Sequence, residues 1–236
     1  VFPLPTIGEE LTKKDIDWAY YAAEPHQAGY IWSAYSSIPN VFLTELWDEH
    51  IWPVDEIMVD IEANALPPVT WITPRFQLSD HPPFSTGHAM NWVTDIINAI
   101  MRSEMWERTA IFITWDEWGG FYDHVVPPEV DSIGLGMRVP MLVISPYARR
   151  GYIDHEVGEF SSPLRFISDN WDLPYLNERI SGTHNYAHAF DFDQGPRPPD
   201  PLPRKKGLVS TPYEFPADYE GWPEDVEIDV PRIRVS

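Results

Sequence analysis

The sequence predicts an α/β fold with a mainly parallel central sheet flanked by helices. Short, β-branched apolar runs, which are typical of buried strands, occur at 68–73, 109–115 and 139–145. A long stretch with apolar residues at helical spacing lies between the first two runs. The alternation of strand, helix and strand along the chain is typical of parallel α/β sheets.

Composition sets limits on size and on the class of partner. The chain has 236 residues, of which 43% are hydrophobic, enough to bury the core of one large α/β domain or two small ones. Its formal net charge of −21 repels phosphate backbones, so no nucleic-acid partner is expected. Without cysteine the chain has no disulfides or thiolate sites, which also fits an extracytoplasmic or secreted protein. No apolar run approaches about 18 residues, so no membrane span is expected.

The first third of the chain contains short elements. Apolar residues at helical spacing predict a short helix within 7–16, and "DWAYY" at 17–21 predicts a strand. Two helical stretches are expected within 39–65, one on each side of Pro53, with Asp55 as the N-cap of the second.

The middle of the chain has the strongest helix signal. The apolar run at 68–73 is ended by Pro74 and predicts a buried strand. The helix that follows is expected to begin at Ser85 or Thr86, either of which can cap it, and to continue to Trp106.

Two more strands and a helix are predicted in the last part of the α/β domain. The run at 109–115 predicts a central strand and the run at 139–145 another strand. Pro163 predicts the first turn of a helix that Ser161 or Ser162 would cap.

From Gln194 the composition becomes rich in proline and loses its periodicity. We therefore expect residues 1–193 to form the α/β domain and 194–236 to form an extended tail packed on it. Aromatic residues of the tail would anchor it to the domain: Tyr213, Phe215, Tyr219 and Trp222.

An acidic pair stands where the 109–115 strand should end. Ligands of α/β sheets bind at the carboxyl ends of strands, which is where Asp116 and Glu117 lie. Gly119 and Gly120 permit a positive φ and a close backbone approach. The alternative interpretation is an acidic turn that caps a helix or binds water.

A sharp turn at the glycines would return Asp123 and His124 towards the same point. Carboxylates with a nearby imidazole are suitable ligands for a divalent cation. The sequence therefore predicts a cation site there, with the acidic turn as its alternative.

Other candidate residues lie in predicted loops. His81 is followed by two prolines that fix the chain, which suits phosphate contact or proton transfer. His155 follows another strand end and can face the same crevice, and Arg138 can meet an anion. Each of the three can instead be an ordinary solvated loop residue. The motifs of α/β-hydrolases and P-loop proteins do not occur.

Several segments together resemble a known family. "TAIFITWDEWGGFYDHVVPP" (109–128) and "GLGMRVPMLVISPYARRGYIDHEVGEFSSPLRFISDNWDLPYL" (134–176) resemble the bacterial phosphoesterase family of phospholipases C and acid phosphatases, within the alkaline-phosphatase superfamily. "SDHPPFSTGHAMNWVTDIINAIM" (79–101) and "DIDWAYY" resemble earlier segments of that family. The resemblance covers about residues 6–192 and is most specific between 110 and 170.

The resemblance implies an alkaline-phosphatase-like fold and a metal-dependent hydrolase of phosphomonoesters or phosphodiesters, phospholipid head groups among them. It implies that Asp116 and Glu117 are ligands of a divalent metal cation and that His81 faces the phosphate. Asp123 and His124 match the end of the same motif and are taken as catalytic candidates. His155 and Arg138 remain candidates for substrate binding.

The resemblance also implies a missing part. The first half of such enzymes carries a Glu-Asn metal pair in an "ENRSFDHYFG"-like stretch and a Ser or Thr nucleophile for in-line attack, and neither is matched. The chain is therefore expected to be the C-terminal half, active only with an N-terminal segment or a second chain. Two rival hypotheses remain, a non-catalytic acidic metal-binding or structural protein, and a hydrolase acting on a carbonyl or glycosidic bond.

Overall fold

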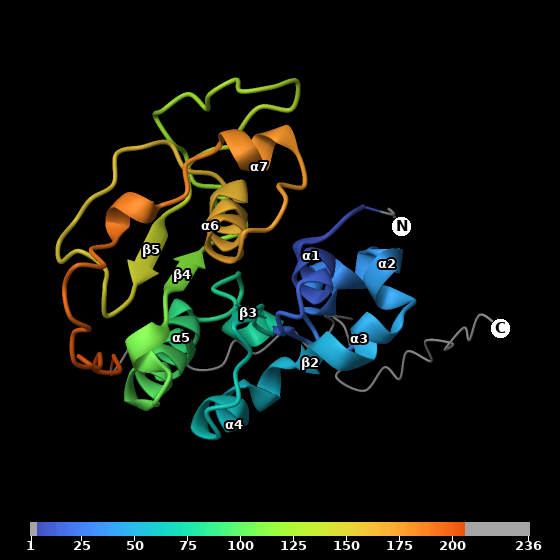
Figure 1. Cartoon of the computed structure of the whole chain (residues 1–236), viewed down its shortest axis with the longest axis vertical. Coiled ribbons are helices and arrows are strands. Elements are labelled where there is room, and N and C mark those ends of the chain that lie inside the picture. Colours follow the sequence, from blue (N-terminus) through green and yellow to red (C-terminus); the bar gives the residue numbers. More distant parts are fainter. Residues whose placement is uncertain (1–3, 206–236) are drawn as a thin grey trace. The chain divides into compact units, whose positions relative to one another are not determined.

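The computed structural model describes residues 4–205. The chain forms two compact units, which are described separately below. Among the described residues, unit 1 comprises 4–103 and 200–205, and unit 2 comprises 104–199. The order of their helices and strands along the chain can be followed in Figure 1. The boundary between domain and tail that the sequence predicts after residue 193 stays a prediction.

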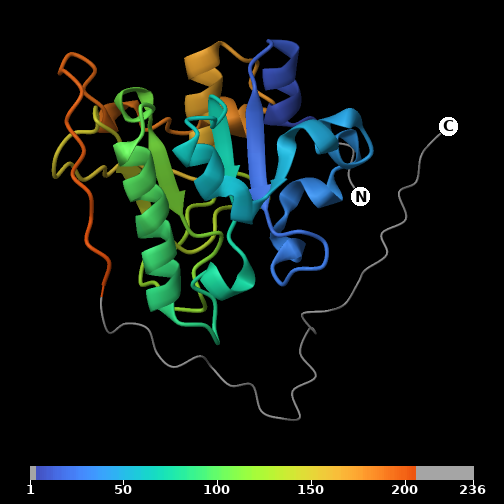
Figure 2. The same ribbon diagram turned by 90° about the horizontal axis from the view of Figure 1, so that it is seen from below.

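Unit 1 contains a three-stranded parallel sheet. Its order is β2-β1-β3, with bounds Ile51–Pro53, Trp18–Ala22 and Val69–Ile72 (Figure 2). Both neighbours run parallel to β1. All five residues of β1 are buried, as expected for a central strand covered on both faces. The prediction of a parallel sheet is confirmed for this unit.

The described part of unit 1 contains five α-helices: α1 (Ile7–Lys13), α2 (Pro39–Phe42), α3 (Glu45–His50), α4 (Ile57–Glu62) and α5 (Thr86–Arg102). Helix α1 begins with a capping box, in which the Thr6 hydroxyl accepts the Glu9 N–H and the Glu9 carboxylate accepts the Thr6 N–H. The expected N-cap at Asp55 is wrong, because Asp55 lies inside a 3₁₀ turn (Val54–Glu56) that leads into α4.

Helix α5 begins where the sequence predicted and ends earlier. The Ser85 hydroxyl accepts the Gly87 N–H and caps the first turn. The helix ends at Arg102 because Ser103 adopts extended backbone angles, so Trp106 falls in a separate 3₁₀ turn of unit 2 (Trp106–Arg108).

Trp18 is the centre of the core of unit 1. Its side chain is 1% exposed, and its indole stacks on the His50 ring with 4.2 Å between centroids. The indole N–H donates to the Thr12 hydroxyl at 2.9 Å, so the polar edge of the ring is satisfied although it is buried. Helix α1 and helix α3 are thereby fixed against β1.

Unit 2 holds a second sheet, in which β4 (Ile111–Thr114) pairs with β5 (Met141–Ile144). The two strands run antiparallel, with Ile111 opposite Ile144. The sequence located both strands, but it assigned them to a mainly parallel sheet with the first as a central strand. This assignment is corrected for residues 4–205, where β4 pairs with β5 alone. An apolar run indicates burial and does not reveal the direction of the neighbouring strand.

Two α-helices complete unit 2, α6 (Ser161–Trp171) and α7 (Glu178–Gly182). The N-cap of α6 is Phe160, so Ser161 and Ser162 lie in the first turn instead of capping it. Aromatic rings join α6 to β4, because Phe166 lies 5.0 Å from Phe112 between ring centroids. A further ring, that of Phe190, lies 5.3 Å from Phe166 and extends this core.

The described part of the proline-rich segment contains no helix or strand. In unit 2, the Trp106 indole donates to the Arg197 carbonyl at 2.9 Å. In unit 1, the Asn98 amide exchanges two hydrogen bonds of 2.8 Å with the backbone of Leu202. The aromatic anchors expected at 213–222 lie outside the described residues. Among residues 4–205, no helix is both long and apolar enough to cross a membrane.

Candidate functional site

The candidate site is built on the loop between β4 and β5, residues 115–140. In Figure 1 this loop leaves the end of β4 and extends beyond α6 and α7 of the same unit. Asp116 and Glu117 follow the last residue of β4, Thr114, after a single intervening residue. Both carboxylates are exposed. Their predicted position at the carboxyl end of a strand is confirmed, although that strand belongs to a two-stranded antiparallel sheet.

The acidic pair is followed by a tight turn. The Glu117 carboxylate accepts the Gly119 N–H at 2.8 Å. Gly119 and Gly120 have φ values of +69° and +75°, in the left-handed region that favours glycine. The prediction of positive φ at the glycine pair is confirmed, and a side chain at Gly119 would also meet the Phe121 ring at 3.1 Å.

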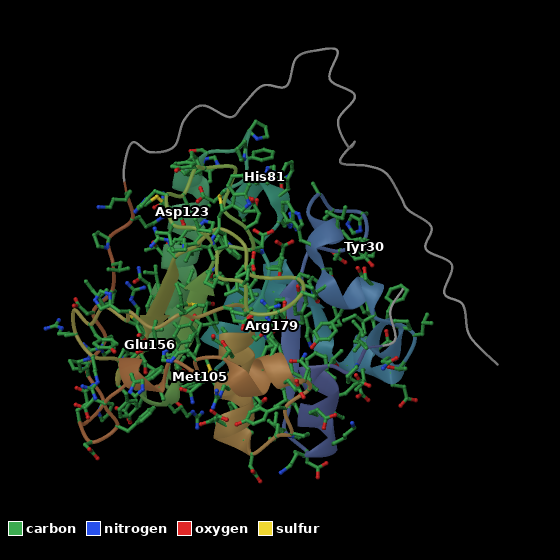
Figure 3. The ribbon with its side chains drawn as sticks, turned by 90° about the horizontal axis from the view of Figure 1, so that it is seen from above. Tyr30, His81, Met105, Asp123, Glu156 and Arg179 are labelled. Atoms are coloured by element: carbon green, nitrogen blue, oxygen red, sulfur yellow. The ribbon has the colours of Figure 1, made fainter. Side chains whose placement is uncertain are left out.

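After the turn, Asp123 is held by Arg138 from the other end of the loop. The Asp123 carboxylate accepts hydrogen bonds from Nε and Nη2 of Arg138, both at 2.8 Å. The Arg138 hydrogen bonds hold the pKa of Asp123 well below its ordinary value, and the same contact raises the pKa of Arg138. Figure 3 labels Asp123 among the side chains of unit 2. Asp123 is therefore an ionised hydrogen-bond acceptor that closes the loop.

An open hollow of about 420 Å³ lies beside this ion pair. Its lining comprises Trp118, Phe121, Tyr122, Asp123, Arg138, Val139 and Pro140. Asp116 and Glu117 are not part of the lining. The hollow thus combines aromatic rings with an Asp–Arg pair, and the acidic pair lies just before it in the chain.

The predicted histidines occupy different surroundings. The side chain of His124 is 82% exposed, and its Nδ1 lies 3.8 Å from the Asp123 carboxylate. His155 is exposed. His81 belongs to unit 1, where its Nδ1 lies 2.5 Å from the Pro82 carbonyl and its ring lies 5.2 Å from that of Phe76. Because His81 and Asp116 belong to different units, their expected proximity stays a prediction.

The acidic pair fits part of a cation site. Carboxylate oxygens are the ligands that hard divalent cations prefer, and such cations take about six oxygen ligands. Within residues 4–205, no group of three or more histidine, aspartate or glutamate side chains is arranged to hold a metal ion. Asp116 and Glu117 therefore offer the ligand chemistry of a hard cation, without a third such side chain grouped with them in the described part of the chain.

Sequence reasoning missed one titratable pair in unit 2. His184 Nε2 lies 2.8 Å from the Asp154 carboxylate, and the His184 ring stacks on His188 with 5.9 Å between centroids. Desolvation opposes ionisation of Asp154, but hydrogen bonds from the Glu156 N–H and from His184 outweigh it and lower the pKa. The two histidines in "THNYAHAF" were the only indication of this pair in the sequence. They did not reveal Asp154, the carboxylate partner of His184, because it lies thirty residues earlier in the chain.

A second arginine holds the middle of the loop. Arg179 of α7 donates to the Glu159 carboxylate at 2.5 Å, and to Asp131 and the Gly134 carbonyl at 3.0 Å each. Figure 3 labels Arg179 at a different place in unit 2 from Asp123. The loop is thus fixed at two separate points by guanidinium groups.

Comparison with known proteins identifies relatives of the chain. The sequence model of the phosphoesterase family matches residues 1–174. Phospholipase C B of Mycobacterium tuberculosis is 33% identical over 196 residues, which cover 70% of this chain and 37% of the relative.

Two further relatives extend the comparison to another bacterium and to a plant. Non-hemolytic phospholipase C of Pseudomonas aeruginosa is 31% identical over 52% of this chain and 22% of the relative. Non-specific phospholipase C6 of Arabidopsis thaliana is 28% identical over 66% of this chain and 33% of the relative. The chain thus matches between about a fifth and two fifths of the length of these three proteins.

Proposed function

The chain belongs to the phosphoesterase family, and from this premise we propose that it is part of a metal-dependent phosphoesterase of the phospholipase C type. The observation that carries the proposal is the Asp116–Glu117 pair. It lies within the segment that the family matches and directly after strand β4. The proposal includes an alkaline-phosphatase-like fold for the complete enzyme.

Asp116 and Glu117 would hold a divalent cation. Both carboxylates are exposed. One oxygen of the Glu117 carboxylate accepts the Gly119 N–H, and this hydrogen bond fixes the orientation of the Glu117 side chain. A bound cation would neutralise charge on the phosphoryl oxygens of the substrate. The two carboxylates supply only part of its shell, which is consistent with the larger size of the phospholipase C relatives.

The other candidate residues would contact or position the ester. The side chain of Arg138 is 60% accessible although it holds Asp123, so it can also bind an anion. His124 is exposed next to this pair and can donate or accept a proton. His81 and His155 keep their proposed roles towards the phosphate.

The proposed partners follow from the same chemistry. The substrate would be a phosphate ester, phospholipids included, and a segment or second chain would supply the nucleophile and the remaining metal ligands. We also propose that the protein acts outside the cytoplasm. Nucleic acid is not proposed as a partner, because the formal charge of −21 opposes it.

The test is hydrolysis of p-nitrophenyl phosphate and of p-nitrophenylphosphorylcholine with added divalent metals. The chain would be assayed alone and joined behind the part of phospholipase C B that precedes the matched region. We expect turnover only for the longer protein. The Asp116→Asn variant should lose at least about a hundredfold in rate, because it removes a metal ligand.

The matched control is Glu129→Gln, which removes an exposed carboxylate from the same loop and should leave the rate unchanged. Turnover that does not change in Asp116→Asn would refute the assigned role. Tight metal binding without phosphate-ester hydrolysis would favour the non-catalytic metal-binding protein. Cleavage of a carboxylic ester or glycoside instead would favour the other hydrolase hypothesis.

A further inference from the structure

Three aromatic side chains of the β4–β5 loop lie on the surface next to the acidic pair. Trp118 is 41% exposed, Phe121 79% and Tyr122 87%. The three residues, which we call the aromatic loop, line the same hollow. Large apolar side chains that are grouped and exposed mark interaction sites more often than singly scattered ones do.

The backbone presents these rings in a fixed turn. Glu117 anchors the start through its bond to the Gly119 N–H, and Asp123 anchors the end through Arg138. The segment between them, residues 118–122, carries no charge. Gly119 and Gly120 make this turn with left-handed backbone angles that residues with side chains rarely adopt.

The composition of the aromatic loop suits a lipid interface. Tryptophan and tyrosine combine an apolar ring with a polar edge, and they concentrate at the head-group level of bilayers. The strong negative charge of the chain repels anionic membranes and leaves zwitterionic ones accessible. A surface of this kind would also place a lipid phosphate close to Asp116 and Glu117, which immediately precede the aromatic loop.

We propose that the aromatic loop docks on a zwitterionic phospholipid surface by inserting Phe121 and Tyr122 among the head groups. This inference rests on the proposed phospholipase C function and adds a docking surface to it. The flanking ion pair of Asp123 and Arg138 is internally neutralised, so it can approach the interface with little repulsion.

The test uses the fact that the chain contains no cysteine. A single Tyr122→Cys substitution, labelled with an environment-sensitive fluorophore, reports whether the loop enters lipid. Ile31→Cys is the matched control, because Ile31 is 84% exposed and lies in unit 1. With phosphatidylcholine vesicles and excess chelator, emission should shift to the blue at position 122 and stay unchanged at position 31.

Cosedimentation with the same vesicles measures the contribution of the rings. Phe121→Ser combined with Tyr122→Ser should weaken vesicle binding by about tenfold or more, whereas Ile31→Ser should bind as the parent does. Phosphatidylglycerol vesicles should bind less than phosphatidylcholine vesicles because of the negative charge of the protein.

The docking proposal is overturned if the parent chain does not bind phosphatidylcholine vesicles, or if the double variant binds them as the parent does. It is also overturned if the double variant instead abolishes a lipid-independent dimer, because the rings would then face a second copy. The assay needs neither metal nor turnover. Vesicle binding by the chain without phosphate-ester hydrolysis by the longer protein would therefore contradict the proposed function alone. Hydrolysis by the longer protein without vesicle binding by the chain would contradict the docking alone.

Discussion

Asp123 accepts four hydrogen bonds, three from Arg138 and one from the Val125 N–H. These hydrogen bonds stabilise the ionised carboxylate. They also occupy both carboxylate oxygens, one of which a general base would need to accept a proton from the substrate or from water. The structure therefore favours a positioning role for Asp123, which holds the two ends of the β4–β5 loop together. The catalytic role that the sequence predicts for Asp123 and this positioning role can be distinguished by experiment.

We predict that Asp123→Asn loosens the loop without unfolding the protein. An amide cannot accept both guanidinium bonds with the strength of a carboxylate, so the Val125 and Arg138 backbone N–H groups should exchange roughly tenfold faster. Hydrogen exchange with mass spectrometry measures this change, and peptides of β1 serve as the internal control. Unchanged exchange at both positions would contradict the positioning role.

The pH dependence of this contact has a definite sign. The pKa of Asp123 is lower in the folded chain than in the unfolded one, where it is about 3.9. Its stabilising contribution is therefore complete above about pH 5, declines as pH falls below the unfolded value, and is lost as pH falls through the lower, folded value. Exchange of the Arg138 N–H should stay constant relative to its intrinsic rate between pH 5 and pH 8.

At the same scale, the sequence located single residues better than it located their partners. Asp116, Glu117 and the two glycines could be placed because a strand and a turn are local features. The Asp123–Arg138 pair joins residues fifteen apart, and Asp154–His184 joins residues thirty apart. Such contacts depend on the path of the loop, which local patterns do not encode.

Helix α1 is packed so closely on β1 that a glycine is required between them. A Cβ atom at Gly8 would lie 2.6 Å from the Trp18 ring, which is itself almost fully buried. The ring cannot move aside, because it is stacked on His50 and its N–H is bonded to Thr12. Helix and strand are therefore fixed at van der Waals contact.

We predict that Gly8→Ala destabilises the chain. The clash should cost about 1–3 kcal/mol, and the better helix propensity of alanine offsets up to about 1 kcal/mol of it. Gly182→Ala is the control, since a Cβ there meets nothing within 4 Å. Urea unfolding should show a lower midpoint for Gly8→Ala, and an equal or higher one for Gly182→Ala. Equal midpoints for both variants would show that Trp18 relaxes.

At the scale of elements, the positions of the strands along the chain could be predicted from the sequence, but the pairing of the strands could be predicted only in part. All four predicted strand segments contain a strand, since each is a compact apolar run. Strand β2 was missed because Ile51–Pro53 is only three residues long and contains a proline. The antiparallel pairing of β4 with β5 was missed because strand direction depends on the connecting loop.

Two buried asparagines of α5 were not anticipated from its apolar spacing. Asn91 and Asn98 are seven residues apart on the helix and bond the backbone of Lys205 and Leu202, three residues apart on an extended segment. Two helical turns and three extended residues both span about 10 Å, so the two spacings match. The buried surface of α5 therefore contains these two asparagines beside the apolar residues that its spacing indicates.

On the scale of the whole molecule, charge dominates the behaviour towards cations. The chain has 37 acidic against 16 basic residues. Such an excess raises the local concentration of any divalent cation and creates many weak binding positions on the surface. Weak surface binding is screened by salt, whereas binding through direct ligands is screened much less. Salt can therefore separate the proposed cation site from the general attraction.

We predict two classes of metal binding in a calorimetric titration of the chain with Mn²⁺. At about 10 mM salt the weak, diffuse class should dominate, and at about 300 mM salt it should largely disappear, because the Debye length then falls to roughly 6 Å. A remaining site that depends on direct carboxylate ligands should be lost in Asp116→Asn and kept in Glu129→Gln. Both variants change the net charge equally, so a difference between them reports the loss of a ligand and not the loss of a charge. If the salt-resistant site survives in Asp116→Asn, or disappears equally in both variants, Asp116 is not a ligand and the cation is held elsewhere.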